Sequence, residues 1–494
     1  MRNQLVIRKH SLALFTVYSS ILVLSTLAAI YLHSVLPLIL PILVAFLFQV
    51  VVDYEKVYLL LFLCLPLSTE VFITEHLATD LPTEPLIVGL MLLYFILVVH
   101  QPKNLSMKFL GHPFSLLLLL HIVWIAITTI TSSEVSFSVK FLLAKIWYVV
   151  TFFYFAGFMF RKKGYVDKIL WLIAIPLALA TLKVILHHAT LNFGFKAINA
   201  ACPPFFRNHV SYAAMLSIFL PFMWYLRKWA KDERAKYWAT VISGILIFAI
   251  VTAYTRAAYV AILLALMAFW IIRFRILALA MGLATVLIIG VLVFLLTGNR
   301  FMELVPSEKT VAHTELSGII SSTSELKDVS TMERYYRWIA GVRMISEKPV
   351  MGFGPGNFYT YYKQYALSRF STYVSGNPEK SGVHNYYLMV TIEQGVIGLI
   401  IFILLVYTIL LRGQDIYHQT TDKKQRDLVM AVLLSSIIID AFLLMNDMIE
   451  TDKLGSFFFL NMAILITVEI NNKRLKDNSN PNNNEETPSL PTPA

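Results

Sequence analysis

Residues 275–297 read RILALAMGLATVLIIGVLVFLLT, and Arg275 is the only charged residue among them. A helix needs about 20 mostly apolar residues to cross a bilayer, so this stretch predicts a transmembrane helix. Working outward along the chain, we find thirteen further apolar segments, of which the shortest are marginal. The sequence therefore predicts an all-α polytopic membrane protein with about 12–14 transmembrane helices. The fourteen candidate spans are 12–32, 35–52, 57–73, 85–99, 113–131, 137–160, 167–187, 210–226, 237–254, 257–272, 275–297, 386–411, 428–446 and 455–470.

The composition excludes a soluble globular protein and a disordered one. Hydrophobic residues make up 57% of the 494 positions and charged residues 14%, whereas an average soluble domain carries about 25% charged residues. Two cysteines exclude a disulfide scaffold, and no group of His, Cys, Asp and Glu has metal-ligand spacing. We therefore expect neither a metal nor another cofactor.

Lysine and arginine concentrate on one side of the predicted spans. If the N-terminus is cytoplasmic, the short inside segments hold 24 of these residues and the short outside loops hold five. The positive-inside rule then predicts two cytoplasmic termini and a long outside insert. The net charge of +11 thus reflects the basic residues of the cytoplasmic loops, and we expect no nucleic-acid partner. The predicted parts are an N-terminal transmembrane bundle (1–297), the insert with its amphipathic helices (298–385), C-terminal transmembrane helices (386–470) and a disordered cytoplasmic tail (471–494).

The insert contains a predicted amphipathic helix at 332–346. Its apolar residues, Trp338 among them, recur at spacings of three and four. Arg334 and Arg337 are three positions apart and hence neighbours on one face, and Glu333 is placed to pair with Arg337. Because a guanidinium group binds phosphate through two parallel hydrogen bonds, this pair favours an anionic ligand.

A glycine-rich stretch, GFGPGNF, follows at 352–358. Gly352, Gly354 and Gly356 form neither a dinucleotide-binding fingerprint nor a P-loop, since the third glycine is misplaced and no Gly-Lys-Ser/Thr follows. Two interpretations remain, a tight turn and a backbone nest that holds an anion. The residues alone favour the plain turn.

The insert ends in SGVHNYYL, where His384 and Asn385 lead into the next predicted span. A histidine at an outside boundary is a candidate general base because its unperturbed pKa lies near neutral. The alternative is a residue that only hydrogen-bonds at a helix start. Glu393 lies nine residues farther on, roughly 13 Å along a helix, so we expect it to have a packing or network role.

Two more arginines lie at the outside boundary. Arg207 occurs in PFFRNHVSY before the eighth span, and Arg256 occurs in AYTRAAY between the ninth and tenth. Arginine is costly at this depth unless it snorkels or pairs. These arginines therefore either reach lipid headgroups or join Arg334 and Arg337 in a diphosphate site.

The stretches ERYYRWIAGVRMISEKPVMGFGPGNFYTYY (333–362) and HNYYLMVTIEQGVIGLI (384–400) resemble the O-antigen ligase and polymerase superfamily of bacterial membrane proteins. The likeness consists of an Arg-Trp helix, a proline, a GxGxxxF motif, a loop-terminal histidine and a helix with Glu-Gln-Gly. The arginine of TRAAY resembles the family's arginine at the outer end of a central helix, and RNHVSYAAML has a loose counterpart. The motif residues here are Arg337, Trp338, Pro349, Gly352, Gly354, Phe358, His384, Glu393, Gln394, Gly395 and Gly398.

The resemblance implies a GT-C-like fold in the bacterial inner membrane, with the large loop in the periplasm. It implies a metal-independent, inverting transfer of a glycan from a polyprenyl diphosphate carrier to an acceptor hydroxyl. The implied partners are the lipid-linked glycan donor, a glycolipid or glycan acceptor, and membrane lipids. The implied site is catalytic His384, diphosphate-binding Arg256, Arg337, Arg334 and Arg207, and a loop or acceptor region of Trp338, Gly352, Gly354, Gly356, Asn385 and Glu393.

Members of this superfamily differ in their acceptor. Ligases use a sugar of the lipid A core, polymerases use a lipid-linked repeat unit, and a third group uses a protein Ser or Thr. We expect a ligase, with the other two as alternatives. A transporter of lipid-linked sugars is the alternative from another class, but its charged site should lie near the membrane midplane. Here the charged motifs gather at the outside boundary, which favours transfer chemistry.

Overall fold

The computed structural model describes residues 2–31, 37, 40–41, 44–45, 53–74, 77–100, 102, 106–302, 329–366 and 382–478. Most of the predicted span 35–52 lies outside the described residues, as do 303–328 and 367–381 of the insert and 479–494 of the tail.

The described residues confirm an all-α polytopic membrane protein. Ten of their helices are long and apolar enough to cross a membrane. Because lipid offers no hydrogen bonds to a backbone, helices are the expected solution. These ten are α4 (Thr83–His100), α6 (Pro113–Ile130), α7 to α8 (Val135–Met159), α9 (Tyr165–Thr190), α11 (His209–Lys228), α12 (Glu233–Thr252), α13 (Arg256–Arg273), α14 (Leu277–Leu296), α18 (Tyr386–Gln419) and α20 (Asp452–Asn478).

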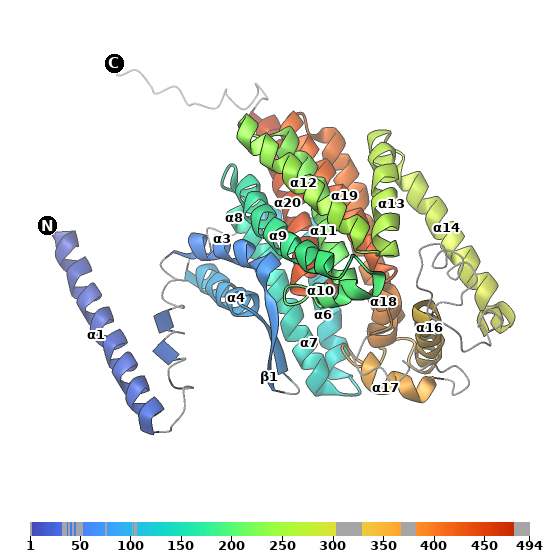
Figure 1. The fold of residues 1–494 in the computed structure, drawn as a ribbon, viewed down its shortest axis with the longest axis horizontal. Coiled ribbons are helices and arrows are strands. Elements are labelled where there is room, and N and C mark those ends of the chain that lie inside the picture. Colours follow the sequence, from blue (N-terminus) through green and yellow to red (C-terminus); the bar gives the residue numbers. More distant parts are fainter. Residues whose placement is uncertain are drawn as a thin grey trace, which may run out of the picture.

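The remaining elements are shorter, more polar or set apart. Helix α19 (Lys423–Leu443) begins with four charged residues among its first five, yet it packs on α11, α13 and α18 inside the bundle. Helix α1 (Arg2–Tyr31) stands apart from the bundle (Figure 1). The others are α3 (Tyr54–Cys64), α5 (Met107–Leu110), α10 (Ile198–Ala201), α16 (Val329–Glu347), α17 (Phe358–Tyr365), the 3-10 turns η2 (Leu65–Leu67), η5 (Phe195–Ala197), η6 (Thr297–Met302) and η7 (Met448–Glu450), and the π turn η4 (Val150–Phe155).

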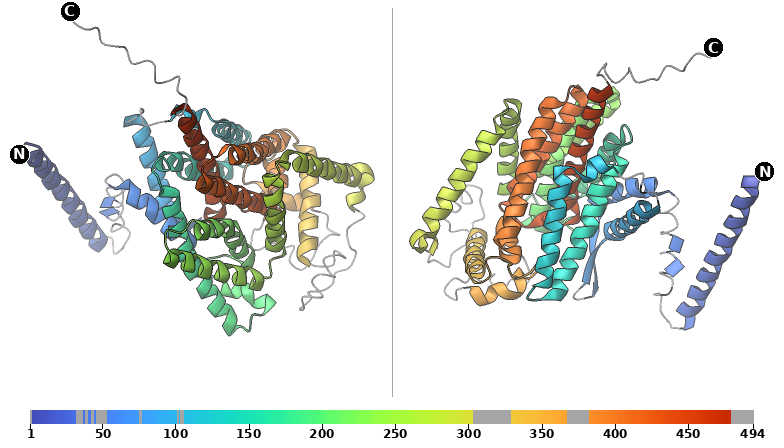
Figure 2. Two further views of the ribbon diagram at one scale, coloured as in Figure 1. Left: turned by 90° about the horizontal axis from the view of Figure 1, so that it is seen from above. Right: turned by 180° about the vertical axis from the view of Figure 1, so that it is seen from behind.

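The bundle has an inner and an outer layer of helices. Helix α20 is the most buried of the ten and packs against α11, α18, α19 and the α7 to α8 segment. Helix α14 lies at the edge, and Leu277 is its only buried residue. Its all-round apolar surface suits contact with lipid tails. Figure 2 shows α18 running beside α6, and the two are in extensive contact.

The predicted third span, 57–73, is wrong. Helix α3 ends at Cys64, and Pro66 falls in the following 3-10 turn. Strands β1 (Thr69–Thr74) and β2 (Leu77–Leu81) then form an antiparallel hairpin with Thr69 opposite Leu81. Proline after a helix end and β-branched residues in β1 explain this local change. Helix α20 also continues through Asn478, beyond the predicted start of the tail at 471.

Helices α16 and α17 gather at one end of the bundle, beside the end of α18 that begins at Tyr386 (Figure 1). The β1–β2 hairpin reaches the same end, and α20 finishes at the opposite one. We call the end of the bundle that carries α16, α17 and the hairpin the loop end. The described part of the insert and the end of the last helix thus lie at opposite ends of the bundle.

Helix α18 is interrupted at Gly395, whose φ of 70° and ψ of −179° are not helical. The turn after α16 supplies the missing hydrogen bonds. Val396 N donates to the Pro349 carbonyl (2.8 Å), and Gly354 N donates to the Glu393 carbonyl (2.9 Å). Irregular backbone within a membrane protein is tolerated where protein satisfies its polar groups. The insert is therefore joined to α18 through main-chain contacts.

Gly395→Ala should break this junction. An added Cβ would lie 1.9 Å from the Val350 carbonyl oxygen, and the backbone conformation is one that essentially only glycine adopts. We expect a loss of about 3 kcal/mol or more of stability. Thermal unfolding of detergent-solubilised protein measures it. Gly244→Ala in α12 is the control, since nothing lies within 4 Å of its added Cβ. Equal midpoints for both variants would contradict the role of the junction.

Candidate functional site

His384 lies between the insert and α18 in a strained backbone conformation. Its φ of 56° falls in the left-handed region, which is uncommon for a residue other than glycine. Asn385 is the N-cap of α18, because its side chain accepts a hydrogen bond from Leu388 N (2.9 Å) and donates to the Leu444 carbonyl (3.0 Å). Asn385, rather than His384, therefore caps α18.

Helix α16 holds the segment before α18 through two adjacent side chains. Arg337 Nη1 donates to the Gly382 carbonyl oxygen (3.0 Å) and to His384 Nε2 (3.2 Å). Trp338 Nε1 donates to the Val383 carbonyl oxygen (3.0 Å). Arg337 is buried and lies 3.8 Å from Glu333, the pair that the sequence spacing predicts. The Arg-Trp motif thus positions the histidine.

The contact with Arg337 determines the protonation state of His384. A guanidinium group only donates hydrogen bonds, so His384 Nε2 must accept and the ring proton must sit on Nδ1. The side chain of Asn446 provides a further hydrogen bond. Burial, with the positive charges of Arg334 and Arg337, lowers the pKa of His384 to about 3. The near-neutral pKa expected from the sequence is therefore wrong for this arrangement, in which the imidazole is neutral.

Arg334 and Arg256 approach the same region from different helices. Arg334 interacts electrostatically with His384 and with His209, the first residue of α11. Thr255 Oγ1 donates to the His209 carbonyl oxygen (3.2 Å), which brings the start of α13, and with it exposed Arg256, beside the start of α11. The structure thus brings Arg334 and Arg337 close to His384 and places Arg256 near His209, which Arg334 also approaches.

Arg207, the fourth predicted arginine, lies elsewhere. Its Nη2 atom forms an ion pair with Glu70 of strand β1 at 2.6 Å. More than half of its side chain is exposed, and it lines a cavity beside the β1–β2 hairpin. The hairpin was not foreseen from the sequence, and neither was this partner.

The glycine-rich turn is a docking element. Its amides donate to α18: Phe353 N to the Ile392 carbonyl oxygen (3.0 Å), and Phe358 N to Glu393 Oε1 (3.0 Å). A Cβ on Gly352 would lie 2.4 Å from the Glu393 carbonyl carbon, so the two backbones approach too closely for a side chain. A backbone nest is present, but the protein's own Glu393 occupies it. Glu393 therefore has the network role that the sequence predicts.

The other two glycines place the turn against the α6–α7 connection. A Cβ on Gly354 would lie 2.2 Å from Ser132 Oγ. Asn357 Nδ2 donates to Ser132 Oγ (2.7 Å), and Ser138 Oγ donates to the Pro355 carbonyl oxygen (2.7 Å). Gly356 has a φ of 79° and contacts this connection more loosely. Four helices are thus joined through one turn.

One comparison with known protein families gives a match. Residues 242–403 match a protein family described as O-Antigen ligase, so this part of the chain is similar to that family. No curated protein matches the sequence. The matched O-antigen ligase region runs from α12 into α18 and includes Arg256, Arg334 and Arg337 of α16, the glycine turn and His384.

Asp447 lies outside the matched O-antigen ligase region and was missed in the sequence. An added Cβ on Gly382 would lie 1.7 Å from Asp447 Oδ2, so glycine is what lets this carboxyl group approach the segment before His384. Burial raises the pKa of Asp447, and the charges of Arg337 and Arg334 oppose that rise. The available signal was the Asn-Asp pair at 446–447, in the segment that follows α19.

A buried lysine fixes the segment that carries Asp447. Lys145 Nζ lies 2.6 Å from Glu450 Oε1 and donates to the Tyr386 hydroxyl (3.3 Å). The Tyr386 hydroxyl also donates to Glu450 Oε1 (2.7 Å). Lys145 thus forms an ion pair with a residue far away in the chain. Its partner is Glu450, which ties η7 to α7 and α18.

Arg337→Gln should raise the pKa of His384. The charge of Arg337 disfavours the imidazolium, so its removal makes protonation easier. NMR titration of histidine-labelled protein measures this pKa, with the His384 resonance assigned from its loss in His384→Gln. Arg343→Gln is the matched control, because Arg343 lies on the same helix and donates to the Tyr365 carbonyl oxygen (2.6 Å). A His384 pKa still near 3 in Arg337→Gln would refute the electrostatic coupling.

Proposed function

We propose that this protein transfers a glycan from a polyprenyl diphosphate carrier to an acceptor hydroxyl at the loop end. The observation that carries the proposal is the hydrogen bond from Arg337 to His384 Nε2, with Arg334 close by. A cationic group that can bind the leaving diphosphate thus lies beside a neutral imidazole that can accept the proton of the acceptor hydroxyl. The O-antigen ligase match supports the same class of reaction.

The arginines would stabilise the negative charge that develops on the leaving diphosphate. When the bond between the anomeric carbon and the diphosphate breaks, its electron pair moves to a phosphate oxygen. Guanidinium groups fixed where that charge develops stabilise the transition state more than the ground state. We assign this role to Arg337, Arg334 and Arg256. The pair of Arg207 with Glu70 makes it the weakest of the four predicted diphosphate ligands.

His384 would act as the general base. Its Nε2 atom removes the proton of the acceptor hydroxyl while the oxygen attacks the anomeric carbon from the face opposite the diphosphate. The configuration at that carbon therefore inverts. The proton passes from the imidazolium to solvent after the diphosphate leaves. Base catalysis of this kind is typically worth roughly 10²–10⁴-fold.

Binding of the donor would itself activate the base. Without the donor, burial and the charges of Arg334 and Arg337 hold the pKa of His384 at about 3, and Arg337 blocks Nε2. A diphosphate on these arginines cancels their repulsion of an imidazolium and draws Arg337 away from the ring. Both changes raise the pKa of His384 toward the operating pH, where a base is most effective. Proton removal is thus coupled to the presence of the leaving group.

We propose a sugar of the lipid A core as the acceptor, and a periplasmic loop end as its location. Deletion of the gene should leave lipid-linked glycan intact and the lipid A core unextended. Analysis of surface lipid and protein glycans measures this. Loss of protein glycans with a normally extended core would overturn the acceptor, and unchanged glycans of every kind would overturn the function.

His384→Ala should reduce transfer by roughly 10²–10⁴-fold in reconstituted membranes with matched protein amounts. His384→Gln should not restore it, since an amide hydrogen-bonds but accepts no proton near neutral pH. His187→Gln is the control, because His187 is exposed at the end of α9. His384→Gln activity within about threefold of wild type would mean that position 384 supplies hydrogen bonding only.

The pH profiles of kcat/KM and kcat should differ. The kcat/KM profile reports the free protein, in which the His384 pKa is about 3, so its acid limb should fall only as pH approaches that value. The kcat profile reports the donor complex, in which the charge of the arginines is compensated, so its acid limb should lie at higher pH. Coincident acid limbs would contradict activation by the donor.

A further inference from the structure

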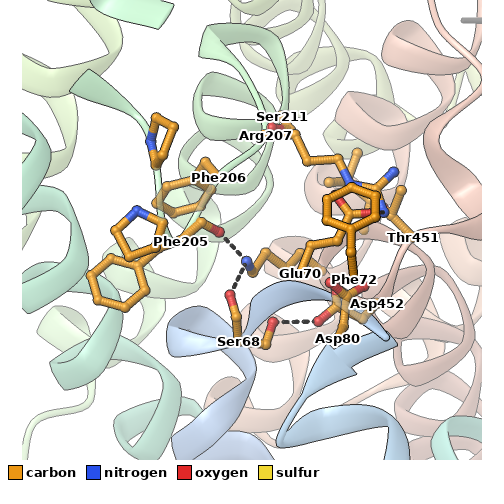
Figure 3. Close-up of a pocket in the computed structure, with 14 residues that line it drawn as sticks. Ser68, Glu70, Phe72, Asp80, Phe205, Phe206, Arg207, Ser211, Thr451 and Asp452 are labelled. Atoms are coloured by element: carbon orange, nitrogen blue, oxygen red, sulfur yellow. Dashed lines mark hydrogen bonds and ion pairs between the residues drawn. The ribbon is translucent and has the colours of Figure 1, made fainter. Parts of the chain in front are cut away.

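The cavity beside the β1–β2 hairpin has a volume of about 370 Å³ and opens at the loop end (Figure 3). Its size falls within the range of about 300–1,000 Å³ typical of small-molecule sites. Three segments form its walls. They are the hairpin with Ser68, the connection that precedes α11 with Phe205 and Arg207, and the start of α20 with Asp452 and Lys453.

Buried polar side chains hold these walls together. Lys453 Nζ donates to the carbonyl oxygens of Ser68 (2.9 Å) and Phe205, linking all three segments. Asp452 Oδ2 accepts hydrogen bonds from Ser68 Oγ (2.5 Å) and Thr83 Oγ1 (3.1 Å). Lys453 and Asp452 are both buried. The cavity is thus shaped by fixed interactions, as a preformed binding site requires.

The charges around the cavity largely cancel. Arg207 forms an ion pair with Glu70 at 2.6 Å. Lys453 interacts electrostatically with Asp452 and Asp80. Burial, together with the charge of Asp452, raises the pKa of Asp80 to about 7, so this carboxyl group is only partly ionised near neutral pH. Without an excess of positive charge, the cavity is unsuited to a diphosphate. It suits a neutral ligand that both donates and accepts hydrogen bonds.

An aromatic ring completes the lining. The Phe72 side chain is 72% exposed and points over the cavity beside Asp80 and Asp452 (Figure 3). Carboxylates accept hydrogen bonds and guanidinium donates them, while a flat ring offers an apolar surface. A pyranose ring presents hydroxyl groups around its edge and C–H groups on its face. The lining matches both parts of such a ring.

One short segment connects this cavity to His384. The Leu444 carbonyl oxygen binds Asn385, Asn446 binds His384, and Glu450 binds Tyr386. The next three residues, Thr451 to Lys453, line the cavity. The cavity and the surroundings of His384 therefore share one segment of the chain.

We propose that this cavity binds a sugar unit of a neutral glycan substrate and holds that glycan while another part of it reacts at His384. The proposal rests on the proposed function, and the sugar belongs either to the lipid-linked donor or to the acceptor. Recognition is by hydroxyl groups against Asp80, Glu70 and Arg207 and by a ring face against Phe72.

A binding experiment on detergent-solubilised full-length protein tests the cavity independently of transfer. The two probes are the oligosaccharide released by mild acid from the host's polyprenyl diphosphate pool and the delipidated core oligosaccharide. Saturation-transfer NMR should give signals on the sugar ring protons of one probe, and the responding probe identifies the source. Phe72→Ala and Asp80→Asn should each remove these signals.

Val71→Ala is the matched control. Val71 precedes Phe72 on the same strand, so its side chain points to the opposite face, and it does not line the cavity. It should leave the sugar signals unchanged. The proposal is overturned if wild-type protein gives no signal with either probe, or if Phe72→Ala and Asp80→Asn bind as wild type does.

A kinetic measurement separates this proposal from the proposed function. In reconstituted membranes, Phe72→Ala and Asp80→Asn should raise the KM of one substrate about tenfold and leave kcat unchanged, as for loss of one hydrogen bond or ring contact. If wild type transfers and both variants keep their KM values within about twofold, the cavity proposal fails alone. If wild type transfers nothing, the proposed function fails.

Discussion

The main-chain contact between the glycine turn and the break in α18 is the constraint on which the rest of the site depends. A helix interrupted at Gly395 leaves peptide groups without helical partners, and those groups need partners from the protein. The turn after α16 supplies them, and Glu393 in turn satisfies an amide of the turn. Because the fit requires backbones to touch at Gly352 and Gly395, it admits one register. That register places Arg337 against His384.

The same contact makes a concentration of positive charge tolerable at the loop end. Buried guanidinium is costly unless it is paired, and the described residues pair Arg337 with Glu333, with backbone carbonyl oxygen and with a neutral imidazole. Asp447 adds a carboxyl group whose ionisation both arginines favour. Burial is the largest cause of the low pKa of His384, and the positive charges of Arg334 and Arg337 add to it, so protonation of the imidazole is unfavourable.

Sequence patterns predicted the parts of this structure that depend on local periodicity. Apolar runs predicted the fold class, and the spacing of Arg334 and Arg337 predicted that they share one face of α16. The hairpin was missed because the apolar run of α3 continues into β1, and length alone cannot distinguish a helix from a strand there. Asp447 and the partner of Arg207 were missed because each contact joins residues far apart in the chain, which no spacing rule encodes. The pKa of His384 was missed for the same reason.

The segment between α19 and α20 shows why such distant contacts matter for function. Its first residues meet Asn385 and His384, its middle is fixed by Lys145 through Glu450, and its end forms a wall of the cavity beside the β1–β2 hairpin. Lys145 is buried, so leaving it without Glu450 would expose an uncompensated charge to an apolar surrounding, a cost of about 3–5 kcal/mol. That ion pair therefore resists independent movement of the segment. Any displacement of the cavity wall must be transmitted to the histidine, which makes the two sites parts of one rigid surface.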